Sequence, residues 1–552
     1  MEDSKFDVII LGTGLTESIV AAALSKWGFR VAHIDQNPYY GGEEASLTLE
    51  EFAKWIDSIS STSGRFSHGT RSGTVPPYAR HYSICLCPTI NPALGSFVDA
   101  LIQSGVSKYS GFRLLERVAV YDGTGAFRAV PGSKEDVFKN KDISLIQKRR
   151  LMRFLTFAVG DFEQSSELQG KHDLPFTDFL DSVFSLSHEL VTVITYALAY
   201  SSQPIDSTIS VLPRIRRYLR SVGRYGTSPF LVGHYGGVGE ISQGFCRTAA
   251  VNGAVYILGR QITSISTYSP SARTSETQPT LTDTSPKPYH YSVTLEDIPE
   301  CLHARAILSS PSYIPDQMNN QSQCPAITPP FRASYTPTCA VRCIAIIEHS
   351  ILLHPPAPEN NDVNDDDSGD EDGGDDQPEE EEGPIDKALD TAVLVFPPNS
   401  LNGGSPDSSA VVLMTGEGTL SAPKGKYILY IYLPVFSNGP AHASQMLEPY
   451  LNAVLRLGRE EPQTPLFTAF YTENLGAIPP CETDSQRHAP WIIPPPVPLG
   501  PLGDVADAAT QNAEILFHAI LEALGDSEGR YQKGDSYDGG IWPKIITTEE
   551  ED

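Results

Sequence analysis

Three residues near the start of the chain have types and spacing suited to binding a dinucleotide. Gly12 and Gly14 follow an apolar stretch at residues 6–11, and Asp35 ends a second apolar stretch. In dinucleotide-binding folds, two such glycines allow a tight turn, the next helix N-terminus receives the pyrophosphate, and an acid about 20 residues further on binds the ribose. These residue types suggest the chemistry of a flavin-dependent oxidoreductase.

The next position of the motif opposes that chemistry. Glu17 stands where the pattern has a glycine or alanine for close packing of the helix on the strand. A carboxylate in the first turn stabilises a helix through its dipole, but this one occupies the region that a diphosphate needs and repels its charge. We therefore expect a Rossmann-type scaffold with a vestigial cofactor turn, made of Gly12, Gly14, Glu17 and Asp35, that binds no cofactor.

Two strands and a helix must position this turn. Residues 6–11 have the length and apolar composition of a strand, residues 17–27 carry apolar side chains at helical spacing, and residues 29–34 form a second short strand. Together they form a βαβ unit. A later glycine-rich stretch leads into a predicted helix at about 240–252 and a strand at 254–258, which return the chain to the same domain.

The composition limits the possible partners and compartments. A chain of 552 residues can form two or more domains, and its net charge of −28 argues against a nucleic-acid partner. Fifteen of its acids and no base fall in residues 359–386, so we expect residues 355–386 to form a disordered acidic loop. Eight cysteines without a C-x-x-C pair indicate reduced thiols in the cytosol rather than metal ligands. We also expect no signal peptide, transmembrane segment or prenylation site.

Helical patterns fill residues 133–225. The segments LMRFLTFAV and ELVTVITYALAY are apolar on more than one face, which is typical of buried helices. Either these helices form a compact core, or two of them part to admit an isoprenoid chain. Basic residues also gather here, as a solvated helix face or as a docking face for an acidic partner. They are Lys148, Arg149, Arg150, Arg153, Arg214, Arg216, Arg217, Arg220 and Arg224.

Several blocks of sequence resemble the family of Rab GDP-dissociation inhibitors and Rab escort proteins. They are LGTGLTES with HIDQNPYYGGEEASLT, KRRLMRFLTF, GRYGTSPFLVGHYGGVGEISQGFCR and SPSYIPD, and they occur in the family's order. The resemblance implies an α/β fold like that of the FAD enzymes but without flavin, with an inserted all-helical second domain.

The resemblance also implies a platform for the switch regions of Rab GTPases. The family builds it from the Tyr-Tyr-Gly-Gly loop and the later glycine-rich block, and the matching residues here are Tyr40, Glu240, Arg247, Tyr256 and Ile257. Arginine and tyrosine commonly anchor interfaces. From the residues alone, Glu240 and Arg247 would instead close structural ion pairs.

A second partner follows from the same resemblance. Escort proteins meet the Rab geranylgeranyltransferase catalytic dimer through the helical domain and through an aromatic residue after Ser-Tyr, where this chain has Ile314. The transferase-contact candidates are Ile314, Arg216, Arg217 and Arg220. Relatives bind the geranylgeranyl lipid of the Rab in the helical domain and contact membranes transiently during delivery from the cytoplasm.

Three functions remain open: a flavin oxidoreductase, a Rab GDP-dissociation inhibitor and a Rab escort protein. We favour the escort protein, because the chain length, the acidic insertion and the blocks around residues 136–157 and 223–231 are closest to that branch. No nucleophile with a base, carboxylate pair or metal cluster emerges, so we expect no catalytic or metal-binding residues.

The expected domain layout has four parts. Residues 1–130 and 227–525 form the two parts of the Rossmann-like domain, the second interrupted by the acidic loop, and residues 131–226 form the helical domain between them. We expect the polar residues 60–74 to form an exposed loop and residues 526–552 to form a disordered tail.

Overall fold

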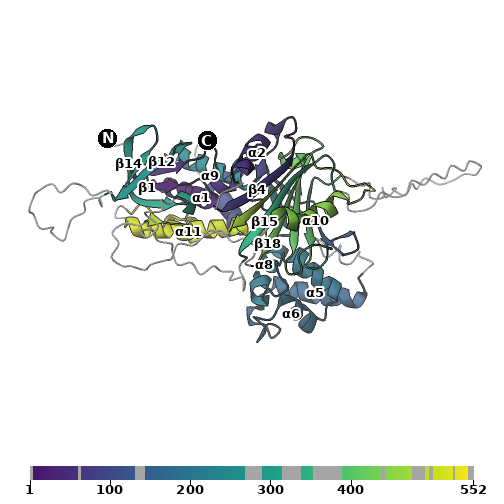
Figure 1. The fold of residues 1–552 in the computed structure, drawn as a ribbon. Helices are drawn as coiled ribbons and strands as arrows, with labels where there is room; N and C mark the ends of the chain where they lie inside the picture. The colour runs from purple at the N-terminus through teal and green to yellow at the C-terminus, as the bar shows by residue number, and fades with distance from the viewer. Residues whose placement is uncertain are drawn as a thin grey trace, which may run out of the picture.

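The chain folds into two large sheets and one group of helices (Figure 1). The computed structural model describes residues 4–59, 64–130, 143–267, 289–313, 337–351, 388–437, 442–459, 461–474, 491–495, 502–525 and 529–544. Ile314 and the acidic residues 355–386 lie outside these ranges. Within the described ranges, no helix is both long and apolar enough to span a bilayer.

The N-terminal βαβ unit lies in a seven-stranded mixed sheet. Its order is β11 (Val255–Leu258), β2 (Val31–Asp35), β1 (Lys5–Leu11), β14 (Ile298–Ser309), β13 (Tyr291–Leu295) and β12 (Ile262–Thr267), and β20 (Trp491–Ile492) also pairs with β14. The strands β11, β2, β1 and β14 run parallel. The carboxyl ends of these strands therefore meet at one edge, where ligands bind in open α/β sheets.

Three helices pack on one face of this sheet. They are α1 (Leu15–Lys26), α9 (Val238–Val251) and α11 (Val505–Leu524), and α1 contacts both of the others. Val8 and Ile10 of β1 belong to the core beneath these helices, whereas Ile9 and Leu11 belong to a core on the opposite face. The alternation is the period of two expected of a strand, and the βαβ unit predicted from the sequence is confirmed.

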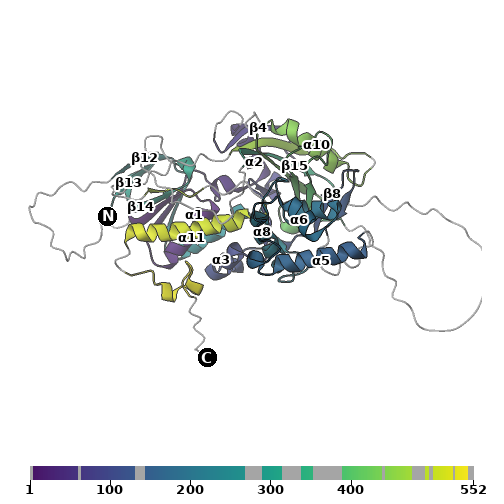
Figure 2. The same cartoon turned by 90° about the horizontal axis from the view of Figure 1, so that it is seen from below.

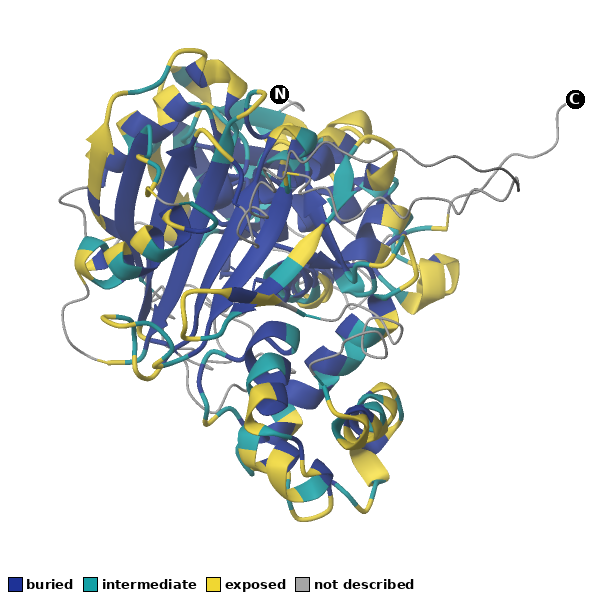
Figure 3. Ribbon diagram, turned by 90° about the vertical axis from the view of Figure 1, so that its right-hand side faces the viewer, coloured by how far each residue is buried: buried dark blue, intermediate teal, exposed yellow. Residues whose placement is uncertain are grey.

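The second sheet has eight strands. Its order is β4 (Phe66–Gly73), β19 (Phe467–Asn474), β15 (Cys339–Ile347), β18 (Tyr427–Val435), β17 (Ala410–Thr415), β16 (Thr391–Phe396), β8 (Arg117–Tyr121) and β9 (Phe127–Ala129). Its central strands are buried (Figure 3), with α10 (Ala443–Leu455) packed on one side. Residues 66–73, which we expected to lie in a loop, pair with β19 instead. Backbone pairing at a sheet edge needs few apolar side chains, so the sequence pattern did not reveal this strand.

Shorter elements connect the two sheets. They are β3 (Ser46–Leu47), α2 (Leu49–Ser58), β5 (Ile84–Cys85), β6 (Asn91–Pro92), α3 (Ser96–Ser104), β7 (Phe112–Leu114) and β10 (Phe230–Gly233). In α2 a capping box fixes the first turn, because Thr48 and Glu51 each accept a backbone amide of the other.

The helical group lies below the eight-stranded sheet (Figures 1 and 2). It contains α5 (Leu145–Val159), α6 (Phe176–Phe184), α7 (His188–Thr192) with a π-helical continuation at Val193–Leu198, and α8 (Thr208–Ser221). Its interior is filled by phenylalanines whose neighbouring ring centroids lie 5.3–6.5 Å apart. Both α5 and α6 therefore close on a compact aromatic core.

Buried charges fasten α8 to the start of α11. The Arg214 Nε lies 2.7 Å from Asp504 Oδ2, and Arg217 contacts both Asp504 and Asp507. Burial alone would raise the pKa of Asp504, but Arg214 and Arg217 hold it below its ordinary value. Asp507 also accepts the Phe97 backbone amide at the start of α3, at 2.8 Å. These charges join the helical group to the three helices of the first sheet.

The C-terminal residues differ from the predicted disordered tail at 526–552. Residues 529–544 are ordered against α1 and α9. The Trp27 indole donates to the Ile541 carbonyl at 2.8 Å, and Trp542 stacks on Phe245 with its ring centroid 6.1 Å away. This polar, glycine-rich segment has few large apolar side chains, so its sequence pattern resembles disorder, although Tyr531, Ile541 and Trp542 each pack against the core.

We expect Asp504→Asn to destabilise the protein by about 3–5 kcal/mol, because it removes the ion-pair partner of the buried Arg214 and leaves Arg217 with Asp507 alone. Urea unfolding measures the loss. Asp161→Asn is the matched control. Asp161 also pairs with an arginine of α8, Arg220, at 3.8 Å, but its side chain is 96% exposed. Equal, small effects of both substitutions would contradict the structural role of Asp504.

Candidate functional site

The vestigial cofactor turn is filled by the protein's own side chains. Asp35, at the end of β2, accepts the Thr13 backbone amide at 2.8 Å and the Thr13 hydroxyl at 2.6 Å. It also accepts the Tyr313 hydroxyl and the side-chain and backbone amides of Asn37. The carboxylate that would bind a ribose in a dinucleotide enzyme therefore holds the turn itself.

Two more carboxylates occupy the N-terminus of α1. Glu44 accepts the Leu15 backbone amide at 2.8 Å, which satisfies a donor that a diphosphate would use. Glu17 folds back over the turn, so that a Cβ on Gly14 would lie 2.6 Å from Glu17 Oε2. The Ser310 hydroxyl donates to Glu17 and lies against Gly12, whose φ of +98° needs a glycine.

These residues do not fit the flavin that many proteins of this fold carry. A diphosphate at the turn would meet Glu17 and Glu44, both buried, and like charges in a buried site repel strongly. Burial is the main cause that raises the pKa of Glu17 to about 7. The hydrogen bond from Ser310 opposes this rise, and the charge of Glu44 adds to it. Glycine still fits best at positions 12 and 14, because the protein's own side chains leave no room for a Cβ atom there.

The predicted platform residues lie on three neighbouring elements. Tyr40 precedes the glycine turn at residues 41–42, Glu240 and Arg247 lie on α9, and Tyr256 and Ile257 lie on β11. The Tyr40 and Tyr256 rings meet edge to face, with centroids 6.0 Å apart. Arg247 is exposed and lies over the Tyr109 ring, 5.3 Å from its centroid.

A close backbone approach joins the two sequence blocks of this platform. A Cβ on Gly41 would lie 2.8 Å from the Ala45 Cα and 3.1 Å from the Gly239 Cα, and a Cβ on Gly239 would lie 2.3 Å from the Ser46 backbone amide. Gly41 also has a φ of +93°. Only glycine fits at both positions, so the Tyr-Tyr-Gly-Gly loop and the start of α9 form one surface.

The alternative in which Glu240 and Arg247 close structural ion pairs finds no support among the described residues. Neither side chain forms an ion pair there, and seven positions along α9 separate the two charges by about 10 Å. Burial raises the pKa of Glu240 above its ordinary value. Both charges are therefore presented to a partner or to solvent.

Sequence reasoning missed several residues around the platform. Tyr109 is fixed on α9, because its hydroxyl donates to the Gly244 carbonyl at 3.1 Å, and its ring supports Arg247. Val251 at the end of α9 is 79% exposed, and Val255 at the start of β11 is 44% exposed. Tyr235, just before α9, is exposed with a φ of 51°, an uncommon conformation for an aromatic residue that often marks functional sites. No periodicity in the sequence marks an exposed apolar side chain.

The transferase-contact candidates have different surroundings. Arg217 is engaged by Asp504 and Asp507, and only 15% of its side chain is exposed. Arg216 lies over the Phe162 ring and pairs with Glu163 at 2.7 Å, and Arg220 donates to the Val159 carbonyl at the end of α5. Ile314 is outside the described residues. Arg149, Arg150 and Arg153 on α5 are exposed, as are Arg220 and Arg224. The helix α5 also exposes Leu145 and Ile146.

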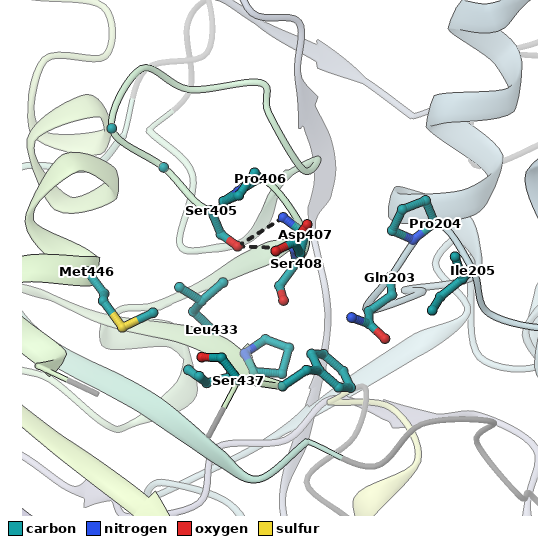
Figure 4. A pocket seen from close by; sticks show the side chains of 15 residues that line it. Gln203, Pro204, Ile205, Ser405, Pro406, Asp407, Ser408, Leu433, Ser437 and Met446 are labelled. Atoms are coloured by element: carbon teal, nitrogen blue, oxygen red, sulfur yellow. Dashed lines mark hydrogen bonds between the residues drawn. The ribbon is translucent and has the colours of Figure 1, made fainter. Parts of the chain in front are cut away.

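A separate cavity of about 540 Å³ lies between the helical group and the eight-stranded sheet. Figure 4 shows Gln203, Pro204 and Ile205 on one side and the loop at 405–408 on the other, with Leu433 and Met446 also lining it. The Ser405 hydroxyl accepts the backbone amides of Asp407 and Ser408 and holds this loop. None of the predicted site residues lines the cavity, and the described ranges contain no cluster of three metal-ligating side chains.

The fold and the filled turn define a protein of the flavoenzyme fold class whose dinucleotide turn is used structurally. A family model described as GDP dissociation inhibitor matches residues 1–276, which is half of the 552 residues. The chain belongs to the GDP dissociation inhibitor family.

Solved structures agree with the fold class. A Rab GDI from Plasmodium falciparum is 20% identical with a TM-score of 0.60, over 94% of this chain and 98% of that one. An oxidoreductase from Methanosarcina mazei is 13% identical with a TM-score of 0.52, over 93% of this chain and all of that one. These similarities confirm the predicted Rossmann-like α/β fold.

Curated relatives match about half of the chain. Proteins named Rab proteins geranylgeranyltransferase component A are 36% identical over 266 residues in Candida albicans and 35% identical over 266 residues in Saccharomyces cerevisiae. A Rab GDP dissociation inhibitor beta from Rattus norvegicus is 34% identical over 272 residues. The matches cover 47–48% of this chain and 41–58% of the relatives, so the chain spans about half the length of the curated relatives it matches.

The raised pKa of Glu17 predicts a pH dependence of stability. Because its value of about 7 in the folded protein lies above the ordinary 4.5, the unfolded chain loses this proton first as the pH rises. The contribution of Glu17 to stability is therefore present below about pH 4.5 and is lost as the pH rises through 7. We expect the stability of Glu17→Gln relative to the unsubstituted protein to rise over that window, by up to roughly 3 kcal/mol.

Thermal or urea unfolding at pH 5 to 8 measures this difference. Glu514→Gln, a change of an exposed carboxylate on α11, should give a curve parallel to that of the unsubstituted protein. If the stability of Glu17→Gln instead changes with pH in the same way as that of the unsubstituted protein, Glu17 does not retain its proton.

Proposed function

We propose that this protein binds unprenylated, GDP-bound Rab GTPases and presents them to Rab geranylgeranyltransferase, then delivers the prenylated product to membranes. The observation that carries the proposal is the platform, in which a glycine contact brings Tyr40, Tyr256 and the exposed Arg247 onto one surface of a GDP dissociation inhibitor family member. An exposed arginine beside tyrosines has the composition of an interface anchor.

The protein would act without catalytic residues of its own, as a non-catalytic component of the transferase. The turn that serves chemistry in flavoenzymes is here filled by Glu17, Glu44 and Asp35, so its role is structural. Holding the GTPase near the active site of the transferase makes the lipid transfer effectively intramolecular. The protein's contribution to rate is then local concentration.

A Rab GDP-dissociation inhibitor is the alternative, and the rat relative of that name favours it. The two yeast relatives named component A favour the escort function. The exposed basic face of α5, with Arg149, Arg150 and the apolar Leu145 and Ile146, suits a second protein partner of acidic character.

The lipid and the membrane enter the proposal through the helical group. A geranylgeranyl chain can enter its core only if α5 and α6 part, because the phenylalanines of both helices fill the space between them. We place the protein in the cytoplasm, with peripheral membrane contact during delivery of the lipid-bearing Rab.

Arg247→Ala should weaken binding of a GDP-loaded Rab by about 1–3 kcal/mol, since it removes an interface anchor that the fold does not need. Tyr40→Ala should act in the same direction. Titration calorimetry measures the affinity, and Arg456→Ala, an exposed arginine at the end of α10, is the control. Unchanged affinity for both platform variants would remove the platform from the proposal.

The escort function is tested by reconstitution. A purified transferase catalytic dimer with geranylgeranyl diphosphate and unprenylated Rab should give almost no product until this protein is added, because the dimer then gains the bound Rab at high local concentration. If the reaction stays silent and the protein instead extracts prenylated Rab from membranes, it is an inhibitor.

Charge reversal on the helical group sharpens this test. Arg149→Glu should lower the amount of prenylated Rab formed while leaving the affinity for Rab unchanged, because the residue lies on α5, away from α9 and β11. Arg456→Glu is the matched control and should affect neither quantity.

A further inference from the structure

A buried histidine connects the vestigial turn to the platform. His33 lies in β2 and is fully buried. Its Nε2 is 2.6 Å from the Gly12 carbonyl oxygen, and its Nδ1 is 3.1 Å from the Tyr256 hydroxyl. The strand pairing supports this contact, because His33 lies opposite Tyr256 where β2 runs parallel to β11.

The partners of the ring define its protonation. A carbonyl can only accept, so Nε2 carries the proton and donates to Gly12, and Nδ1 accepts the hydrogen of the Tyr256 hydroxyl. Burial lowers the pKa of His33 to about 4, more than the contacts with Gly12 and Asp35 raise it. A neutral ring with one donor and one acceptor therefore fixes the direction in which Tyr256 points its hydroxyl.

The neighbourhood of Tyr256 also reaches the turn through α9. The Cys246 sulfur lies near Tyr256 and 3.3 Å from the Ser18 hydroxyl oxygen. Ser18 in turn donates to the Thr13 carbonyl at 3.1 Å. Two chains of contacts therefore join the turn to Tyr256, one from Gly12 through His33 and one from Thr13 through Ser18 and Cys246.

Tyr256 passes this constraint to the surface. Its ring packs at 5.0 Å from His33 on one side and at 6.0 Å from Tyr40 on the other, measured between centroids. We propose that His33 is a positioning residue for partner binding: by joining the Gly12 carbonyl to the Tyr256 hydroxyl, it sets the two platform tyrosines in the arrangement that receives the protein partner. The inference rests on the proposed function.

Two conservative substitutions test this link. Tyr256→Phe removes only the hydroxyl that meets His33, and His33→Gln retains an amide donor for Gly12 but loses the ring acceptor. We expect each variant to bind a GDP-loaded Rab about 5- to 20-fold more weakly, and the double variant to be no weaker than the worse single variant, because both break one interaction. His518→Gln, an exposed histidine on α11, should bind as the unsubstituted protein does.

A second measurement separates positioning from general destabilisation. Nitrogen-15 NMR of labelled histidine should show His33 protonated at Nε2 and not at Nδ1, and Tyr256→Phe should shift the Nδ1 resonance. The melting temperature of each variant is recorded alongside, and a loss of affinity without loss of fold supports the proposal.

The outcomes are distinct. If the unsubstituted protein binds no Rab, the proposed function is wrong. If it binds Rab but the effects of the two substitutions multiply in the double variant, or neither weakens binding, the platform stands and the positioning role of His33 is wrong.

Discussion

The hydrogen bonds of Asp35 are the constraint on which the rest of this structure depends. One buried carboxylate at the end of β2 binds the turn after β1 through Thr13 and the segment after β14 through Tyr313. Three neighbouring strands thus end at the same acceptor. In a dinucleotide enzyme the corresponding carboxylate would accept hydrogen bonds from the ligand. Here the hydrogen-bond donors described for this carboxylate belong to the protein itself. A carboxylate with several donors is strongly anchored in a low-dielectric interior.

Because the protein's own side chains fill the turn, the same fold can support a binding surface outside the dinucleotide site. Glu44 caps α1 and lies in the loop that follows Tyr40, so the group that replaces a ligand phosphate also fixes the platform loop. Arg65 holds the neighbouring Glu43 at 3.4 Å and Glu473 of β19 at 2.9 Å, which ties this loop to the eight-stranded sheet. Contacts from both sheets therefore support the platform, although of its residues only Tyr256 and Ile257 lie in a sheet, the seven-stranded one.

The sequence predicted the fold well where local pattern and chemistry agree. The βαβ unit and the helical insert could be inferred because their apolar periodicity is visible in the residues themselves. The capping by Glu44 was not predicted, because its partner Leu15 is 29 positions away and no short-range pattern marks such a pair.

The sequence did not show which charged residues lie at the surface and which lie in the interior. The sequence does not distinguish Arg216, Arg217 and Arg220, yet Arg217 pairs with Asp504 and is mostly covered while Arg220 is half exposed. The difference depends on where α11 begins, nearly 300 positions later. The order of residues 529–544 could not be predicted for a related reason. Their few aromatic side chains pack on helices that are distant in the sequence, and a few separate contacts of this kind produce no periodic apolar pattern.

The buried ion pairs between α8 and α11 constrain the whole molecule more than they stabilise it. Desolvating Arg214, Arg217 and Asp504 is costly, and well-packed apolar residues often give equal or greater stability. Charged groups with hydrogen-bonding geometry, however, accept few alternative arrangements, so such a cluster fixes the angle between two packed elements. Here α8 belongs to the helical group, and α11 packs on α1 beneath the platform sheet. Under the proposed function, in which one partner binds the platform and another binds the helical group, that angle has to be constant, because the benefit of effective concentration vanishes when the two sites cannot be engaged together.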